Sequence, residues 1–329
     1  MIINVNSVNK VGFIDLEIDP KLDLTQEIKK LKIEKNAIIL AHYYQNPEIQ
    51  DIADFVGDSL ALSQRTVNID SDIIVFAGVK FMAETAKILS PSKKVLLPDI
   101  NAGCSLADSC KYEDFKNFIA KYPNHKVITY VNTTAEIKSL SDICCTSSNA
   151  IKIVNSVPNN QGIVFAPDKN LGSYIKSITG RENMVIWDGA CHVHEEFSLE
   201  SILQLKKENP KAKLIAHPEC KKPILLVADF IGSTSELLNY SKRDSSDIYI
   251  VATESGIIHQ MKRESPKKMF ISPAPKASNC GCSECVFMKM ITLKKIYLTL
   301  KYELPEIVLD EELMNRARLP IQKMLEISK

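Results

Sequence analysis

The sequence predicts an α/β fold: a pseudo-threefold arrangement of three similar three-layer αβα domains with short parallel sheets, and an active site at their junction. An apolar run that ends in a polar residue occurs three times, and an acid follows each run. The acids Asp54, Asp142 and Asp229 are 88 and 87 residues apart. A hydroxyl stands five residues after each acid, and a cysteine recurs in each copy. Because each copy contributes the same groups, we expect one shared site.

Each copy contains three apolar runs that we interpret as strands. Their apolar residues are continuous rather than alternating, which is typical of parallel strands buried on both faces. The runs cover residues 38–42, 74–78 and 94–98, then 127–132, 163–167 and 184–188, then 214–217, 249–253 and 268–272.

Between these runs the apolar residues recur with a period near 3.6, which predicts helices over residues 47–55, 81–89 and 255–263. Alternating strands and helices indicate α/β units with right-handed crossovers. Such sheets carry their functional groups at the carboxyl ends of the strands. His42, Asn132 and His217 occupy these ends.

We expect three domains. The first combines residues 1–92 with C-terminal helices in 286–329, the second is 93–180, and the third is 181–285 with a cysteine-containing loop. Outside the repeat, residues 10–35 are interpreted as a strand followed by a helix. Residues 285–329 are interpreted as two helices separated by a break near Pro305.

Composition argues against several functional classes. The chain has 329 residues, of which 45% are hydrophobic, and a net charge of +1. A net charge this close to zero argues against a surface of one sign that would bind nucleic acid or a membrane. The first twenty residues lack the pattern of a signal peptide, and no apolar run approaches the roughly 18 residues that span a bilayer. We therefore expect a cytoplasmic protein without nucleic-acid or membrane partners.

The nine cysteines are the strongest chemical signal. Cys104, Cys191 and Cys280 are 87 and 89 residues apart and match the repeat. Three thiolates suit zinc or an iron–sulfur cluster, and three ligands leave one metal position open to substrate. The alternatives are buried inert cysteines, or a local zinc clip made by Cys280, Cys282 and Cys285. The remaining cysteines have no partner in repeat register and are expected in the core: Cys110, Cys144, Cys145 and Cys220.

Hydroxyls and polar strand ends complete the candidate site. The three repeated hydroxyls lie in turns that open helices and can bind carboxylate or phosphate: Ser59, Ser147 and Thr234. His42 and His217 stand at equivalent strand ends. Glu219 is a candidate general base, and Tyr44 or Tyr130 can exchange a proton.

These motifs together resemble the quinolinate synthase family over nearly the whole chain. The stretches that carry the resemblance are residues 41–45, 50–55, 57–59, 81–89, 102–107, 130–133, 145–147, 193–195, 217–220 and 228–235. The resemblance implies condensation of iminoaspartate with dihydroxyacetone phosphate to quinolinate, phosphate and water, in the de novo synthesis of NAD. It also implies a functional link to an aspartate-oxidising enzyme that supplies iminoaspartate.

The resemblance further implies a [4Fe–4S] cluster held by one cysteine per domain, with the open iron acting as Lewis acid for dehydration. Cys104 and Cys191 match two ligand positions. Repeat spacing favours Cys280 as the third ligand, whereas the family pattern, a cysteine shortly before Met-Lys, favours Cys285. We adopt Cys285, because a loop can lengthen without moving the site.

Within this resemblance we expect Glu219 to be the principal base, with His217, His42 and Tyr44 assisting. The residues expected to bind substrate are His42, Ser59, Tyr130, Asn132, Ser147, His217, Glu219 and Thr234. Two other classes remain open. One is a radical enzyme of the diphthamide type that uses S-adenosylmethionine. The other is a redox sensor built on Cys280, Cys282 and Cys285.

Overall fold

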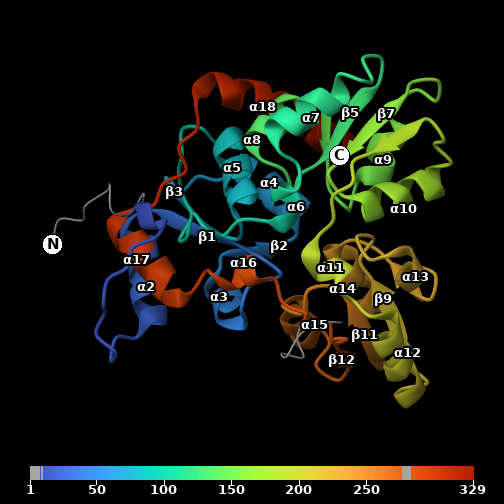
Figure 1. Ribbon diagram of the computed structural model, residues 1–329. Coiled ribbons are helices and arrows are strands. Elements are labelled where there is room, and N and C mark those ends of the chain that lie inside the picture. Colours follow the sequence, from blue (N-terminus) through green and yellow to red (C-terminus); the bar gives the residue numbers. More distant parts are fainter. Residues whose placement is uncertain (1–7, 9, 276–282) are drawn as a thin grey trace. The chain divides into compact units, whose positions relative to one another are not determined.

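The structure is a computed structural model that describes residue 8, residues 10–275 and residues 283–329. Its described strands form three parallel four-stranded sheets with the same spatial order (Figure 1). The first sheet runs β2 (Phe55–Gly57), β1 (Ala37–His42), β3 (Ile73–Ala77), β4 (Lys94–Leu96). The second runs β6 (Ile143–Cys145), β5 (Lys126–Tyr130), β7 (Ile163–Ala166), β8 (Met184–Ile186). The third runs β10 (Phe230–Ile231), β9 (Lys213–Ala216), β11 (Ile248–Ala252), β12 (Met269–Ile271).

The predicted α/β class with three similar parallel sheets is confirmed. All nine predicted strands are present, and each sheet has in addition a short edge strand, namely β2, β6 or β10. The central strands are buried along their lengths; β1, for example, is buried at all six residues. Burial on both faces explains their continuous apolar sequence.

Helices alternate with these strands. They are α2 (Leu24–Glu34), α3 (Pro47–Ile52), α4 (Ser59–Val67) and α5 (Lys80–Leu89) around the first sheet, and α6 (Ser105–Asp108), α7 (Tyr112–Ile119), α8 (Ala135–Ser139), α9 (Ala150–Asn155) and α10 (Lys169–Thr179) around the second. The third copy contains α11 (His192–Glu195), α12 (Leu199–Glu208), α13 (Lys222–Leu225), α14 (Thr234–Arg243) and α15 (Ile257–Glu264). The chain continues with α16 (Val286–Lys289), α17 (Leu293–Tyr302) and α18 (Glu311–Ile327).

Helix packing repeats as well. The helix pairs α4–α5, α9–α10 and α14–α15 each pack together in their own copy. In the first copy, α2 and α17 pack together against β1 and β3, so the sheet lies between helix layers (Figure 1). The repeated helix pairs are the crossover helices that join the strands in the same order.

Two expectations outside the repeat are wrong. The described residues between 10 and 23 contain no strand, and α2 is the first long helix. The C-terminal region has three helices rather than two, because the one-turn helix α16 precedes the break at Pro305. None of the helices in the described part of the chain has the length and apolar character needed to cross a membrane.

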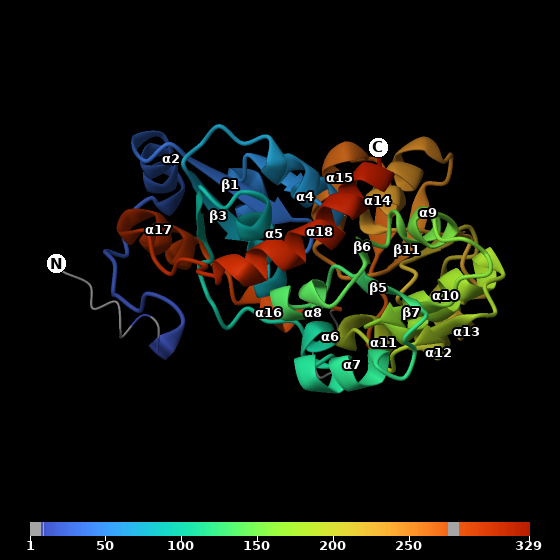
Figure 2. The same ribbon diagram turned by 90° about the horizontal axis from the view of Figure 1, so that it is seen from above.

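The chain divides into two compact units. One comprises residues 1–104 and 286–315 and contains the first sheet; the other comprises residues 105–285 and 316–329 and contains the second and third sheets. Figure 2 gives a second view of the same elements. The boundaries of the three expected domains stay a prediction.

The repeated acids turn out to be structural. Each accepts a hydrogen bond from a backbone N–H of the first strand of its copy and returns its own N–H to the carbonyl of the same residue. The pairs are Asp54 with Ile39, Asp142 with Val127 and Asp229 with Leu214. A lysine pairs with each carboxylate at 2.6–3.0 Å: Lys32, Lys126 and Lys206. The acid therefore holds the segment before the edge strand against the first strand of its copy.

Replacement of Asp142 by alanine is expected to lower the free energy of unfolding by about 1–3 kcal/mol, because the N–H of buried Val127 loses its acceptor. Urea unfolding measures the change. The exposed Glu182 provides a matched control, and Glu182→Ala should lie within about 0.5 kcal/mol of the unmodified protein. Equal stability of the two variants would contradict a structural role for Asp142.

Candidate functional site

The candidate residues follow the carboxyl ends of the strands in both units. His42 ends β1, and Tyr44 follows it, in the first unit. In the second unit, Tyr130 ends β5, and His217 directly follows β9. The members found in the first unit are His42, Tyr44, Ser59 and Cys104, and those in the second are Tyr130, Asn132, Ser147, Cys191, His217, Glu219, Thr234 and Cys285.

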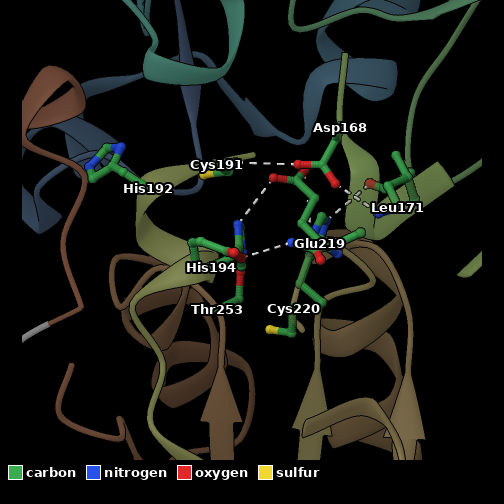
Figure 3. Close-up of polar contacts among 12 residues, drawn as sticks. Asp168, Leu171, Cys191, His192, His194, Glu219, Cys220 and Thr253 are labelled. Carbon is green, nitrogen blue, oxygen red and sulfur yellow. Dashed lines mark hydrogen bonds and ion pairs between the residues drawn. The ribbon is translucent and has the colours of Figure 1, made fainter. Parts of the chain in front are cut away.

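A buried carboxylate organises the second unit. Glu219 is only 2% exposed, and its Oε1 accepts a hydrogen bond of 2.6 Å from the Tyr130 hydroxyl. Its Oε2 lies 3.1 Å from His194 Nδ1 (Figure 3). Burial alone would raise the pKa of Glu219, but the neighbouring imidazoles of His194 and His217 and the hydrogen bond from Tyr130 lower it below its usual range. These neighbours therefore favour the ionised form of the Glu219 carboxylate.

His217 connects this carboxylate to a hydroxyl. The Glu219 backbone N–H donates to His217 Nδ1 at 3.3 Å, which leaves the ring proton of a neutral imidazole on Nε2. Nε2 then donates to Ser147 Oγ at 3.2 Å. The structure thus brings four predicted residues into one chain of contacts: Tyr130, Glu219, His217 and Ser147.

The first unit repeats this histidine geometry. The Tyr44 backbone N–H donates to His42 Nδ1 at 3.2 Å, two residues along the chain, as at His217. The His42 and Tyr44 rings meet edge to face with centroids 4.4 Å apart. Two equivalent strand ends therefore present an imidazole with the same preferred tautomer.

The repeated hydroxyls lie near helix starts. Ser59 is the first residue of α4, and Thr234 is the first residue of α14. Ser147 lies in the turn between β6 and α9. Asn132 and Thr146 follow the neighbouring strands β5 and β6. The side-chain oxygens Asn132 Oδ1 and Thr146 Oγ1 are buried without a hydrogen-bond partner among the described residues. Such atoms call for a ligand or bound water.

Sequence reasoning assigned no role to His194 or Asp168. His194 stacks on His217 with ring centroids 4.7 Å apart, and its Nε2 lies 2.9 Å from Thr253 Oγ1. Asp168 is fully buried; burial, together with the charge of Glu219, raises its pKa well above the usual range. Their positions in the sequence could have indicated the site, because Asp168 and Thr253, the partner of His194, both follow the carboxyl ends of strands.

One set of donors is close enough to surround a metal ion. Ligand atoms of Cys191, His194 and Glu219 all lie within 4.8 Å of one another (Figure 3). Thiolate and imidazole are ligands that zinc and iron prefer. A metal held near Cys191 would therefore lie beside the candidate base.

A backbone hydrogen bond recurs beside each predicted cysteine ligand. Its donor is the N–H three residues past the second strand of the copy, and its acceptor is the carbonyl two residues before the cysteine. The pairs are Lys80 to Ala102 (2.7 Å), Lys169 to Gly189 (2.8 Å) and Ser255 to Ser283 (3.0 Å). By this bond Cys104, Cys191 and Cys285 occupy equivalent positions.

The element that follows each cysteine is also the same. Cys104, Cys191 and Cys285 directly precede the one-turn helices α6, α11 and α16. The Cys191 side chain forms no capping hydrogen bond with its helix. Cys280 and Cys282 lie outside the described residues. The equivalence of Cys285 with Cys104 and Cys191 agrees with the ligand position expected from the family pattern rather than from sequence spacing.

The other four cysteines suit a core better than a metal site. Burial raises the pKa of Cys110 to about 12 and that of Cys144 to about 11, and it raises those of Cys145 and Cys220 well above the ordinary value. The Cys220 thiol donates to the Ala252 carbonyl at 3.3 Å. Raised pKa values of this kind are typical of inert cysteines buried in a core. Cys104, Cys191 and Cys285 are half-buried, and a thiolate is the ligand type that iron–sulfur clusters use.

Comparison with known proteins agrees with this chemistry. Residues 26–326 match the family model described as quinolinate synthetase A protein. A quinolinate synthase of Microcystis aeruginosa is 60% identical over 306 residues, covering 93% of this chain and 95% of the relative. Those of Gloeothece citriformis and Synechocystis sp. are 59% and 58% identical, covering 93% of this chain and 94% and 96% of the relatives.

Proposed function

The chain belongs to the quinolinate synthetase A family, and from that premise we propose that it condenses iminoaspartate with dihydroxyacetone phosphate. The products are quinolinate, one phosphate and two waters, which balances the atoms of the two substrates. An aspartate-oxidising enzyme would supply the iminoaspartate for NAD synthesis. A cluster with an open iron requires a reducing compartment, for which the cytoplasm is our expectation.

The observation that carries the proposal is the buried Tyr130–Glu219–His217–Ser147 chain of contacts. It joins a carboxylate, two proton-bearing groups and an anion-binding hydroxyl within one unit. Condensation of an imine with a carbonyl compound requires repeated proton transfers, and the substrates carry carboxylates and a phosphate. The arrangement supplies both needs.

Cys104, Cys191 and Cys285 would hold a [4Fe–4S] cluster. When bound, the cluster supplies a Lewis-acidic iron for the loss of hydroxyl groups. The protein's own task is to present three thiolates at equivalent loops and leave the remaining coordination position to substrate.

Glu219 is the principal base. Its ionised carboxylate accepts a substrate proton, and Tyr130, which donates to the same carboxylate, can return one. His42 offers its Nε2–H group to developing negative charge, with Tyr44 assisting beside it. His217 assists through the Nε2–H group that it shares with Ser147. The residues that would hold carboxylate or phosphate oxygens are Ser59, Tyr130, Asn132, Ser147 and Thr234. His42, His217 and Glu219 would also contact the substrate, as proton-transferring groups.

Ser147→Ala tests this function. We expect KM for dihydroxyacetone phosphate or iminoaspartate to rise about tenfold, because one hydrogen bond to an anionic group is lost. Ser156, whose hydroxyl donates to the Ile153 carbonyl, gives the control variant Ser156→Ala with unchanged kinetics. Steady-state kinetics on cluster-loaded protein measures both. An unchanged KM for both substrates would contradict a binding role for Ser147, whereas absence of any quinolinate formation by the unmodified protein would favour a redox-sensing function that does not need this hydroxyl.

A further inference from the structure

Two buried acids occupy the same position in the second and third copies. Asp168 lies two residues after the end of β7, and Glu254 lies two residues after the end of β11. Both are fully buried. Neither belongs to the catalytic contacts described above, and a buried acid is retained only where its oxygens find hydrogen-bond donors.

Each acid accepts a hydrogen bond from the main chain of a proposed ligand. The Cys191 N–H donates to Asp168 Oδ2 at 3.3 Å, and the Cys285 N–H donates to Glu254 Oε1 at 3.2 Å. The contact with Asp168 is drawn in Figure 3. The same contact therefore recurs in two copies, although the acids differ in length by one methylene.

The second oxygen of each acid is bound to its own loop. Asp168 Oδ1 accepts from the Leu171 N–H at 2.7 Å and caps α10. Glu254 Oε2 accepts from the Gly256 N–H at 2.7 Å. Each carboxylate thus bridges the strand-end loop and the backbone of the cysteine.

This bridge lies beside the repeated backbone bond. The residue after each acid, Lys169 or Ser255, donates its N–H to the carbonyl two residues before the cysteine. The cysteine segment is consequently held at two points, once by the backbone and once by the acid. Two points of attachment fix the direction of the segment, whereas one would allow it to rotate.

The first copy lacks the acid. Val79, which is buried, stands at the equivalent position, although the backbone bond from Lys80 to Ala102 is kept. The acid is therefore not required by the fold of the repeat, since the first copy forms the same sheet without it. The acid is a feature that the second and third copies share and the first copy lacks.

We propose that Asp168 and Glu254 are positioning residues for the cluster, holding the main chains of Cys191 and Cys285 in the orientation that ligation requires. This rests on the proposed function, because it presumes that these cysteines bind the cluster. Groups that orient metal ligands from outside the coordination sphere govern metal retention, and their loss typically costs 10–100-fold in affinity.

The test uses Asp168→Asn and Glu254→Gln in the cluster-loaded protein. Each amide can keep one acceptor oxygen for its own loop but turns an NH₂ group toward the cysteine N–H. The first readout is the rate of iron release to a chelator, which we expect to rise about tenfold in each variant. The second is the electron paramagnetic resonance spectrum of the reduced cluster, whose g-values should change when ligand orientation changes.

Asp58→Asn is the matched control. Asp58 is a buried acid that caps α4 through the Ala61 N–H, so the same exchange is made at a helix cap, whereas the Cys191 and Cys285 N–H groups donate to Asp168 and Glu254. Its iron release and spectrum should match those of the unmodified protein. Release at the unmodified rate in both test variants, or faster release with an unchanged spectrum, would overturn the positioning role. If the unmodified protein takes up no iron, the proposed cofactor fails instead.

Discussion

Replacement of Glu219 by glutamine is expected to lower kcat for quinolinate formation about 10³-fold, within the range that a general base contributes. The amide has nearly the same shape but cannot accept a proton. The Tyr130 hydroxyl can still donate to its carbonyl oxygen, so the loss reflects chemistry rather than collapse of the site. Steady-state kinetics on protein of equal iron content measures it.

Two variants frame this result. Tyr130→Phe removes only the hydroxyl that bonds Glu219, so a smaller loss of about tenfold is expected. Glu236→Gln changes another acid of the second unit, but glutamine also serves in its capping box, so kcat should not change. If Glu219→Gln retained more than a tenth of the activity, another residue would have to be the principal base.

Replacement of Cys285 by serine is expected to remove most of the iron and all measurable quinolinate formation, whereas Cys280→Ser should retain both. Cys285 carries the repeated position, two residues after the carbonyl that accepts the Ser255 N–H. A cluster that loses one of three protein thiolates is left with too few anchors. Iron analysis of anaerobically purified protein should give about four irons per chain before substitution and well under one in Cys285→Ser.

The matched pair makes this prediction sharp. Both substitutions exchange the same atoms, five residues apart in the sequence, so a general disturbance of this segment would affect both variants. Loss of iron only in Cys280→Ser would mean that sequence spacing, rather than the structural register, identifies the ligand. Loss in both would favour a local metal clip made by neighbouring cysteines.

The long central strands could be predicted because burial on both faces leaves continuous apolar runs. The edge strands β2, β6 and β10 could not, since two or three residues carry no periodic signal. Phe55, Ile143 and Phe230 each follow one of the repeated acids and pair with equivalent residues of the neighbouring strand, but this pairing is a long-range property. Register between strands depends on tertiary contacts rather than on local sequence.

The candidate site was predictable where it follows strand ends. His217, Glu219 and Tyr130 lie close together because the ends of β9 and β5 carry them. His194 was missed because it lies on the short helix α11, eight residues after the end of β8 in the sequence. Asp168 and Glu254 were missed because their role depends on a hydrogen bond to a loop more than twenty residues away.

The repeated acids are conspicuous in the sequence but have a structural role. Asp54, Asp142 and Asp229 were the clearest markers of the repeat, yet their carboxylates bind backbone N–H groups and lysines. A residue can recur because each copy needs the same hydrogen bonds to keep its strands together. Symmetry in the sequence therefore identifies the repeated fold, whereas Glu219, the proposed base, has no counterpart among the repeated acids.

The most direct test of the account is a product assay with anaerobically reconstituted protein, enzymatically generated iminoaspartate and dihydroxyacetone phosphate. We expect quinolinate and phosphate to form in equal amounts, in proportion to cluster content. Protein that carries a full cluster and binds both substrates but releases no quinolinate would contradict the account.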